Sequence, residues 1–266
     1  GLELTWDDIA QVSSSVPVIT NIVPNGDMSC INLYKAGGVP ALLKTVEELL
    51  EGCCMTVTGK TLAENLDRDI AIDRTVIRTM DDDASVASGI QVLYGNLAPK
   101  GTLVKTSAVP EDLHVFTGTA RVFDSEDACY EAFGQGTIEP GCAVVIRYEG
   151  PVGGPGMKEL HHVTAIMRGI PHSGVITDGR FSGASGGLSI GYLCPEAAAG
   201  GPIALVQDGD RIHIDLTRNL IELEVPADEL ERRRADLEPS GHTVDRGLLP
   251  RYARMVDSAR TGAAVR

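Results

Sequence analysis

A glycine-rich loop that contains a serine is the part of the sequence best suited to chemistry. The apolar run that begins at Val175 gives way to Asp-Gly-Arg-Phe-Ser-Gly-Ala-Ser-Gly-Gly at residues 178–187. Because glycine has no Cβ, such a loop lets backbone amides crowd around a small anion. A serine among these amides and beside a cation can act as a base or a nucleophile, although most glycine-rich turns are only turns. Ser182 is therefore a candidate catalytic residue.

A second glycine-rich stretch, residues 147–159, lies between an apolar run and a predicted helix. Free amides at a helix N-terminus attract anions, and the carboxylates of Glu149 and Glu159 suit a hard cation such as Mg²⁺. The structural alternative is that Glu159 caps the helix and Glu149 forms a surface ion pair. Glu159 also stands three residues before His162, as in a di-iron helix, but the sequence has no second copy of that motif. A mononuclear metal site on Glu159 and His162 is a further alternative.

The composition is that of an ordinary globular protein, with 43% hydrophobic residues in a chain of 266. The formal net charge of −14 argues against nucleic-acid binding, which depends on clustered Lys and Arg. The basic run Arg232–Arg234 stands among acidic residues and is typical of a solvated helix face. No apolar run reaches the ~20 residues of a membrane helix, and no basic-then-apolar signal pattern opens the chain. We therefore expect no membrane partner and a cytoplasmic location.

The six cysteines show no metal-binding spacing. The sequence has no C-x-x-C pair and no Cys/His pattern of a zinc site, so a metal cluster bound wholly by this chain is not expected. Free cysteine is usually buried. We therefore predict that all six are structural, with the adjacent Cys53 and Cys54 buried at the start of a strand.

The elements that must position these residues are predicted to form a mixed α/β fold. Thr5 is predicted to cap the first helix, and residues 38–50 carry an apolar stripe typical of a core-facing helix. Further helices are predicted at residues 62–66, from Asp124 to Gly134, after Gly156 and over residues 227–237.

From about Thr75 the sequence changes to short apolar runs separated by glycine turns, which predicts a strand-rich region. The last two runs alternate apolar and polar residues across a short turn, as in a hairpin with one solvated face. Strands interspersed with helices favour a barrel-like sheet flanked by helices. The predicted strands are 92–95, 103–105, 115–116, 120–123, 143–148, 174–177, 203–206, 211–216 and 220–225.

Several separate motifs, in order and spacing, point to one enzyme family. They are residues 57–65, 97–101 with 104–105, 147–157, 177–183, 195–197 with 200–203, 208–210 and 259–262. Through them the chain resembles about the C-terminal half of the dihydroxy-acid dehydratase and phosphogluconate dehydratase family. Phe181 and residues 195–210 favour the branched-chain dihydroxy-acid enzymes, whereas residues 183–186 are similar to the phosphogluconate branch.

The resemblance implies dehydration of a 2,3-dihydroxy carboxylic acid to a 2-keto acid. It implies that Ser182 is the base that removes the C2 proton, and that Glu159 rather than Glu149 is a ligand of Mg²⁺. The pKa of an unassisted serine is too high for this role, so a neighbouring cation and backbone amides must lower it. The substrate is expected to contact the two glycine-rich loops at Arg180, Gly183, Ser185 and Gly154.

The resemblance also implies an iron–sulfur cluster, [2Fe–2S] or [4Fe–4S], that acts as a Lewis acid on the 3-hydroxyl group. Its cysteine ligands, the other Mg²⁺ ligands and a modified lysine belong to an N-terminal region that the sequence lacks. The chain is therefore expected to carry half of an active site and to show no turnover alone. The implied partners are a small-molecule dihydroxy acid and a second copy of the chain in a homodimer. A sugar-acid or phosphogluconate dehydratase and a non-catalytic domain are the alternatives.

The resemblance and the change in texture together predict three regions. Residues 1–70 are predicted to be the end of an N-terminal α/β domain whose beginning is missing. Residues 71–226 are predicted to form a swivelling, barrel-like C-terminal domain with the active-site loops, and residues 227–266 a helical tail.

Overall fold

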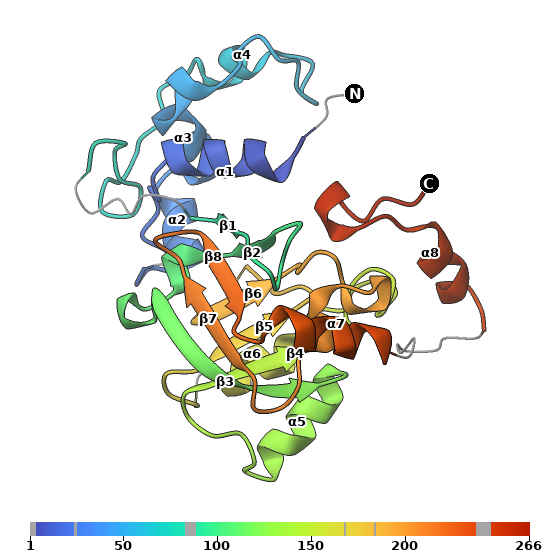
Figure 1. Ribbon diagram of the computed structural model, residues 1–266. Helices are drawn as coiled ribbons and strands as arrows, with labels where there is room; N and C mark the ends of the chain where they lie inside the picture. The colour runs from blue at the N-terminus through green and yellow to red at the C-terminus, as the bar shows by residue number, and fades with distance from the viewer. Residues whose placement is uncertain (1–3, 24–25, 83–88, 168, 184, 238–245) are drawn as a thin grey trace. The chain divides into compact units, whose positions relative to one another are not determined.

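The structure is a computed structural model that describes residues 4–23, 26–82, 89–167, 169–183, 185–237 and 246–266. The chain forms two compact units, one of Gly1–Gln11 with Ile90–Arg266 and one of Val12–Gly89. Figure 1 shows the elements along the chain. Among the described residues, every helix is too short or too polar to cross a membrane. The division into regions 1–70, 71–226 and 227–266 stays a prediction.

The smaller unit is built from short helices: α2 (Cys30–Lys35), α3 (Gly38–Thr45), the 3₁₀ turn η1 (Glu47–Leu49) and α4 (Leu62–Leu66). Ser29 and Thr61 each form a capping box, which fixes where α2 and α4 begin. The helix predicted over residues 38–50 is α-helical only as far as Thr45. Its Val39 is 61% exposed, whereas Leu42 of the same apolar stripe packs, with buried Ala41, in the small core of this unit.

The cysteines of the smaller unit correct one prediction. Cys53 and Cys54 are exposed, and they lie in a turn before an isolated bridge between Met55 and Thr61. The hydrogen bond from Thr56 N to the Lys60 carbonyl, at 2.9 Å, closes this surface loop. The prediction of two buried thiols entering a strand is wrong, because a short loop of this kind leaves its side chains in solvent.

The larger unit is organised around an eight-stranded mixed sheet with the order β1-β2-β6-β5-β4-β3-β7-β8. Strands β3 to β6 are parallel neighbours, and the other pairs are antiparallel. The strands are β1 (Gln91–Leu93), β2 (Thr102–Val104), β3 (Val115–Phe123), β4 (Cys142–Ile146), β5 (Gly174–Thr177), β6 (Leu188–Gly191), β7 (Arg211–Asp215) and β8 (Leu220–Leu223).

The two ends of this sheet meet. Tyr94 N donates to the Asn219 carbonyl and Ile221 N donates to the Tyr94 carbonyl, each at 2.9 Å, beside an isolated bridge between Tyr94 and Leu220. Gly95 permits this approach, because a Cβ there would lie 1.9 Å from the Ile221 carbonyl oxygen. The sheet is therefore a nearly closed barrel flanked by helices, which confirms the predicted fold class.

Alternate residues of the central strands pack on opposite faces of the sheet. Every strand contributes to one core inside the barrel, for example through Val145 and Ile176. A second core, which contains Val144 and Ile146, lies against α5 (Glu126–Gly134) and α6 (His161–Met167). All residues of β4 and β5 are buried, as in parallel strands covered on both faces.

Most predicted strands are confirmed, with three differences. The runs 115–116 and 120–123 form the single strand β3, because Gly118 stays paired with Ile212 of β7. The run 203–206 is not a strand but the 3₁₀ helix η5 (Pro202–Leu205). Pro202 stands at the start of this helix, where its fixed φ suits a helical turn and its missing N–H costs nothing. Strand β6 had no predicted counterpart.

The remaining elements are short. At the N-terminus, Thr5 and Asp8 cap α1 (Trp6–Ser15) reciprocally, as predicted, with Asp8 N 3.2 Å from Thr5 Oγ1. Near the C-terminus lie α7, α8 and the turn η6, and three further 3₁₀ turns lie between strands. Their bounds are α7 (Ala227–Ala235), α8 (Leu249–Met255), η6 (Ala259–Thr261), η2 (Thr106–Ala108), η3 (Glu111–Leu113) and η4 (Ala197–Ala199).

Candidate active site

The two glycine-rich loops leave the same edge of the sheet. Strands β4 and β5 are adjacent and parallel, with Ile146 paired to Thr177, so the loops that follow them begin side by side. An isolated parallel bridge pairs Glu159 with Arg180, and Leu160 N donates to the Arg180 carbonyl at 3.2 Å. The structure therefore brings together Glu159 and Arg180, two of the predicted site residues.

Arg180 and Tyr192 form one corner of the candidate site. Arg180 Nε donates to the Met157 carbonyl at 2.5 Å, which ties the side chain to the first loop. Tyr192 follows β6 and is half-buried. Burial raises the pKa of its phenol, while the charge of Arg180 lowers it and that of Glu159 raises it, so the phenol lies within electrostatic reach of both. Sequence reasoning missed Tyr192, whose one signal is its place directly after a strand.

The serine loop is held against the segment that follows β2. Lys105 Nζ donates to the Gly183 carbonyl at 2.5 Å, so a cation lies one residue along the backbone from Ser182. Burial lowers the pKa of the Lys105 ammonium group. Ser182 itself is partly exposed. Sequence reasoning required a cation near this serine but did not identify Lys105, which appeared only as part of a family motif.

The other predicted substrate contacts differ in their exposure and in whether their polar groups already form hydrogen bonds. Ser185 is buried, and its Oγ has no hydrogen-bond partner within the described ranges. A buried hydroxyl of this kind calls for a partner, and the described residues do not supply one. Gly183 is exposed, whereas the amide of Gly154 already donates to the Gly150 carbonyl at 2.8 Å. The substrate-binding roles of these residues stay predictions.

Glu149 and Glu159 occupy very different environments. Glu149 is 1% exposed, and its Oε1 accepts a hydrogen bond from Glu126 N at 2.9 Å, at the start of α5. Glu159 is exposed. The α6 amide of His162 donates to Glu126 Oε1 at 3.0 Å, so Glu126 caps that helix. The structural alternative, in which Glu149 forms a surface ion pair and Glu159 caps the helix, is wrong. Glu149 is buried, and the carboxylate that caps α6 is that of Glu126. The ammonium group of Lys158 lies near the carboxylates of Glu126 and Glu149.

Two more buried carboxylates lie beside the loops, and sequence reasoning missed both. Asp178 is fully buried and Glu196 is 6% exposed. Burial raises the pKa of Asp178 to about 6 and that of Glu196 to about 7, against backbone hydrogen bonds that lower both values. Each carboxylate accepts hydrogen bonds from backbone amides of the first loop.

The described residues do not form a complete metal centre. They include no group of three or more His, Cys, Asp or Glu side chains placed to hold a metal ion. Glu159 is one exposed carboxylate, and its predicted role as a Mg²⁺ ligand stays a prediction. The alternative of a metal site on Glu159 and His162 finds no support among the described residues. Burial raises the pKa of the thiols of Cys142, Cys194 and Cys129, the last to about 12, which disfavours the thiolate that a cluster needs.

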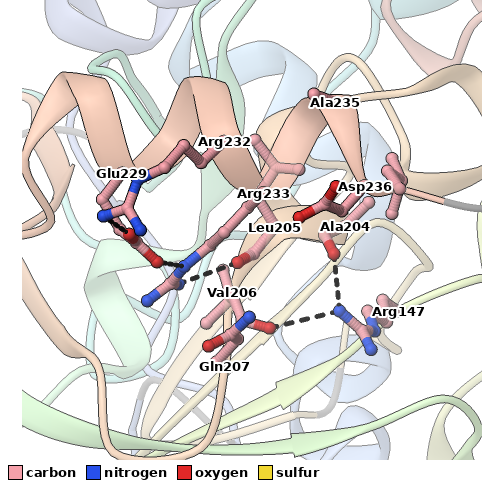
Figure 2. A pocket seen from close by; sticks show the side chains of 11 residues that line it. Arg147, Ala204, Leu205, Val206, Gln207, Glu229, Arg232, Arg233, Ala235 and Asp236 are labelled. Carbon is pink, nitrogen blue, oxygen red and sulfur yellow. Dashed lines mark hydrogen bonds and ion pairs between the residues drawn. The ribbon is translucent and has the colours of Figure 1, made fainter.

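A cavity of about 500 Å³ lies elsewhere, between α7, η5 and Arg147 (Figure 2). Arg147 Nη1 donates to the carbonyls of Ala204 and Val206, at 2.7 and 3.2 Å. Arg233 donates to the Leu205 carbonyl and to Asp210. None of the eleven residues that line the cavity is a predicted site residue, and its inward arginines are bound by the protein itself. The cavity therefore marks the place where α7 packs on the barrel.

Comparison with known proteins decides the family. The family model described as "Dihydroxy-acid/6-phosphogluconate dehydratase C-terminal" matches residues 75–263, and the corresponding N-terminal model matches residues 1–65. The chain belongs to the dihydroxy-acid/6-phosphogluconate dehydratase family. This confirms the resemblance drawn from the motifs.

Curated relatives agree with this assignment. A dihydroxy-acid dehydratase from Ignicoccus hospitalis is 47% identical over 270 residues, which cover 100% of this chain and 49% of the relative. One from Acetivibrio thermocellus is 46% identical over 99% of this chain and 48% of the relative. Dihydroxy-acid dehydratase 1 from Nocardia farcinica is 46% identical over 98% of this chain and 47% of the relative. The chain thus spans about half the length of the curated relatives it matches.

Proposed function

We propose that this chain is part of a hydro-lyase that dehydrates a 2,3-dihydroxy carboxylic acid to a 2-keto acid. The observation that carries the proposal is the sheet edge where two parallel strands bring Glu159 and Arg180 together and begin the serine loop. The printed names of the relatives support the same class of reaction.

In the proposed reaction Ser182 is the base. Its alkoxide Oγ takes the proton from C2, the electrons of that C–H bond form the C2=C3 bond, and the C3–O bond breaks. The departing hydroxide takes from Ser182 the proton removed from C2 and leaves as water, which returns the serine to its alkoxide. The resulting enol then becomes the 2-keto acid. The Lys105 ammonium on the Gly183 carbonyl and the amides of the loop favour the alkoxide that Ser182 needs.

Arg180, Gly183, Ser185 and Gly154 are the proposed substrate contacts. A guanidinium such as that of Arg180 suits a carboxylate, and the orphaned hydroxyl of Ser185 can donate to a substrate oxygen. Together these groups would fix C2 of the substrate near Ser182.

The cofactors of the proposed enzyme depend on more than the described residues. We infer that Mg²⁺ and an iron–sulfur cluster, [2Fe–2S] or [4Fe–4S], are bound mainly by a part of the protein outside this chain, and that Glu159 adds one ligand to Mg²⁺. A homodimer and a cytoplasmic location stay predictions.

Branched-chain dihydroxy acids are the favoured substrates, because Phe181 and residues 195–210 resemble the branched-chain enzymes. The relatives' name, dihydroxy-acid dehydratase, supports the wider class of dihydroxy acids. A sugar-acid or phosphogluconate substrate is the second candidate, since the matching family model includes 6-phosphogluconate dehydratases. Initial rates of the full-length enzyme with a branched-chain dihydroxy acid and with 6-phosphogluconate distinguish the two. A third reading, that the chain alone is a non-catalytic domain, predicts no turnover by these 266 residues.

The substitution Ser182→Ala in the full-length enzyme tests the base. Loss of a general base typically costs about 10²–10⁴-fold in rate, so we expect a loss of this size in kcat with unchanged iron content and thermal midpoint. Ser189→Ala is the matched control, because its hydroxyl makes only a 3.4 Å contact with the Gly186 carbonyl, and we expect its activity to be close to normal. Near-normal turnover by Ser182→Ala would refute the assignment.

A further inference from the structure

We propose that Asp178 and Glu196 are positioning residues for the dehydration, because their buried carboxylates hold the turn 148–153 in the one conformation that sets Glu159 against the serine loop. This inference rests on the proposed function. It assigns a role to two acidic side chains that the proton transfer itself does not use.

Asp178 ties together segments that follow three different strands. Its Oδ2 accepts hydrogen bonds from Tyr148 N at 3.1 Å and from Ala197 N at 2.8 Å, and its Oδ1 accepts one from Glu149 N at 3.0 Å. Tyr148 and Glu149 follow β4, Asp178 follows β5, and Ala197 lies beyond β6. Because both carboxylate oxygens serve different donors, one side chain fixes the start of both glycine-rich loops.

Glu196 holds the far side of the same turn. Val152 N donates to both carboxylate oxygens at 3.1 Å, and Gly153 N donates to Oε2 at 2.9 Å. A Cβ on Gly150 would lie 2.5 Å from Glu196 Oε2, so the backbone of the turn packs directly on the carboxylate. The two acids therefore hold the turn 148–153 from two sides.

The turn needs such restraint because its conformation is not a preferred one. Tyr148 has φ 65°, a left-handed value that a bulky side chain disfavours. Glu149 is buried, so its amide would lose its partner inside the protein if the Asp178 carboxylate moved. Without these acceptors the turn is expected to relax toward other backbone conformations.

A shift of the turn reaches Glu159 by two routes. One route is the loop itself, in which Glu159 follows the turn by a few residues. The other passes through side chains, since Glu149 Oε1 accepts from Glu126 N at 2.9 Å and Glu126 Oε1 accepts from His162 N at 3.0 Å. Asp178 also directly precedes the Gly179–Arg180 segment that pairs with Glu159. A displacement of about 1 Å at a reacting group can cost 10²-fold in rate.

The test compares Asp178→Asn and Glu196→Gln in the full-length enzyme. An Asn at position 178 has one acceptor oxygen, so either Glu149 N or the pair of Tyr148 N and Ala197 N loses its acceptor. A Gln at position 196 can keep both of its donors, because Oε2 alone accepts from Val152 N and Gly153 N. We expect kcat per folded enzyme to fall about 10- to 100-fold for Asp178→Asn and much less for Glu196→Gln, with smaller changes in KM.

Hydrogen exchange of the same variants separates positioning from general destabilisation. We expect faster exchange in peptides that cover 148–153, with β4 and β5 unchanged. Asp208→Asn is the control, since this half-exposed carboxylate accepts from Val122 N at 2.6 Å away from the loops, and it should keep normal kcat.

Normal kcat in Asp178→Asn, despite faster exchange in the turn, would overturn the inference while leaving the role of Ser182 intact. Uniformly faster exchange throughout the barrel would also overturn it, because the acids would then be ordinary structural anchors. If Asp178→Asn does not fold, Glu196→Ala takes its place, with Glu196→Gln expected to restore most of its kcat. Equal kcat in Glu196→Ala and Glu196→Gln would again contradict the inference. An active Ser182→Ala enzyme would refute the proposed function instead.

Discussion

Replacing Glu196 by Gln should remove a pH-dependent loss of stability from the larger unit. Burial raises the pKa of the Glu196 carboxyl group from 4.5 to about 7, and the charge of Asp178 adds to this, while hydrogen bonds from Gly153 and Val152 oppose it. The folded protein therefore binds more protons than the unfolded chain between these two pH values. The resulting stabilisation is complete below pH 4.5 and is lost as the pH rises through 7.

The size of the effect follows from the difference between the pKa of Glu196 in the unfolded chain and its pKa in the folded protein. One pKa unit corresponds to about 1.4 kcal/mol, so the free energy of unfolding of the unmodified protein should fall by about 3 kcal/mol relative to Glu196→Gln between pH 4.5 and pH 8. Glutamine stays neutral at every pH and resembles the protonated glutamate. The variant should therefore gain relative stability as the pH rises.

Tryptophan fluorescence during urea unfolding measures this difference. Trp6 is the one tryptophan in the sequence, it is 5% exposed, and it packs with Val92 and Cys194 in the larger unit. The matched control is Glu224→Gln, a half-exposed carboxylate paired with Arg211. If the stability difference between Glu196→Gln and the unmodified protein is the same at pH 5 and pH 8, the reasoning is wrong.

Two further predictions concern stability and thiol reactivity. Arg233→Ala should lower the free energy of unfolding by about 3 kcal/mol, because it leaves the Asp210 side chain, which is only 10% exposed, without its ion partner. Arg232→Ala, whose side chain is 73% exposed, should change it by less than about 1 kcal/mol, and equal losses in urea unfolding would contradict the role given to Arg233. Mass spectrometry after brief alkylation of the folded chain should find three modified thiols and three protected ones, and modification of the protected set without denaturant would refute the assigned burial. The thiols expected to react are those of Cys30, Cys53 and Cys54, and the protected ones are those of Cys129, Cys142 and Cys194.

The elements that local signals define were predictable from the sequence. Ser125 accepts from Ala128 N at the start of α5, as a cap followed by an amphipathic run predicts. The alternating runs 211–216 and 220–225 became the β7–β8 hairpin. Both glycine-rich loops were found for the same reason, since their composition is visible within a few residues.

The contacts that complete the site were not predictable in this way. Lys105 meets Gly183 across 78 positions, and Glu149 meets the Glu126 amide across 23. No periodicity joins residues so far apart in sequence, because the sheet order alone makes them neighbours. Residues 203–206 show the converse error, since an apolar run of four is as compatible with a buried 3₁₀ turn as with a strand.

The junction between Tyr94 and Leu220 has a consequence for how this unit is made in the cell. A ribosome that has completed β1 must add well over a hundred further residues before the chain offers the partner that closes the sheet. Until β7 and β8 emerge, the free edges of β1 and β3 can pair with another nascent chain. Long-range closure of this kind is also slow. Synthesis of the last hairpin thus ends a period in which the growing polypeptide is exposed to aggregation, and loss of β7 and β8 would make that exposure permanent.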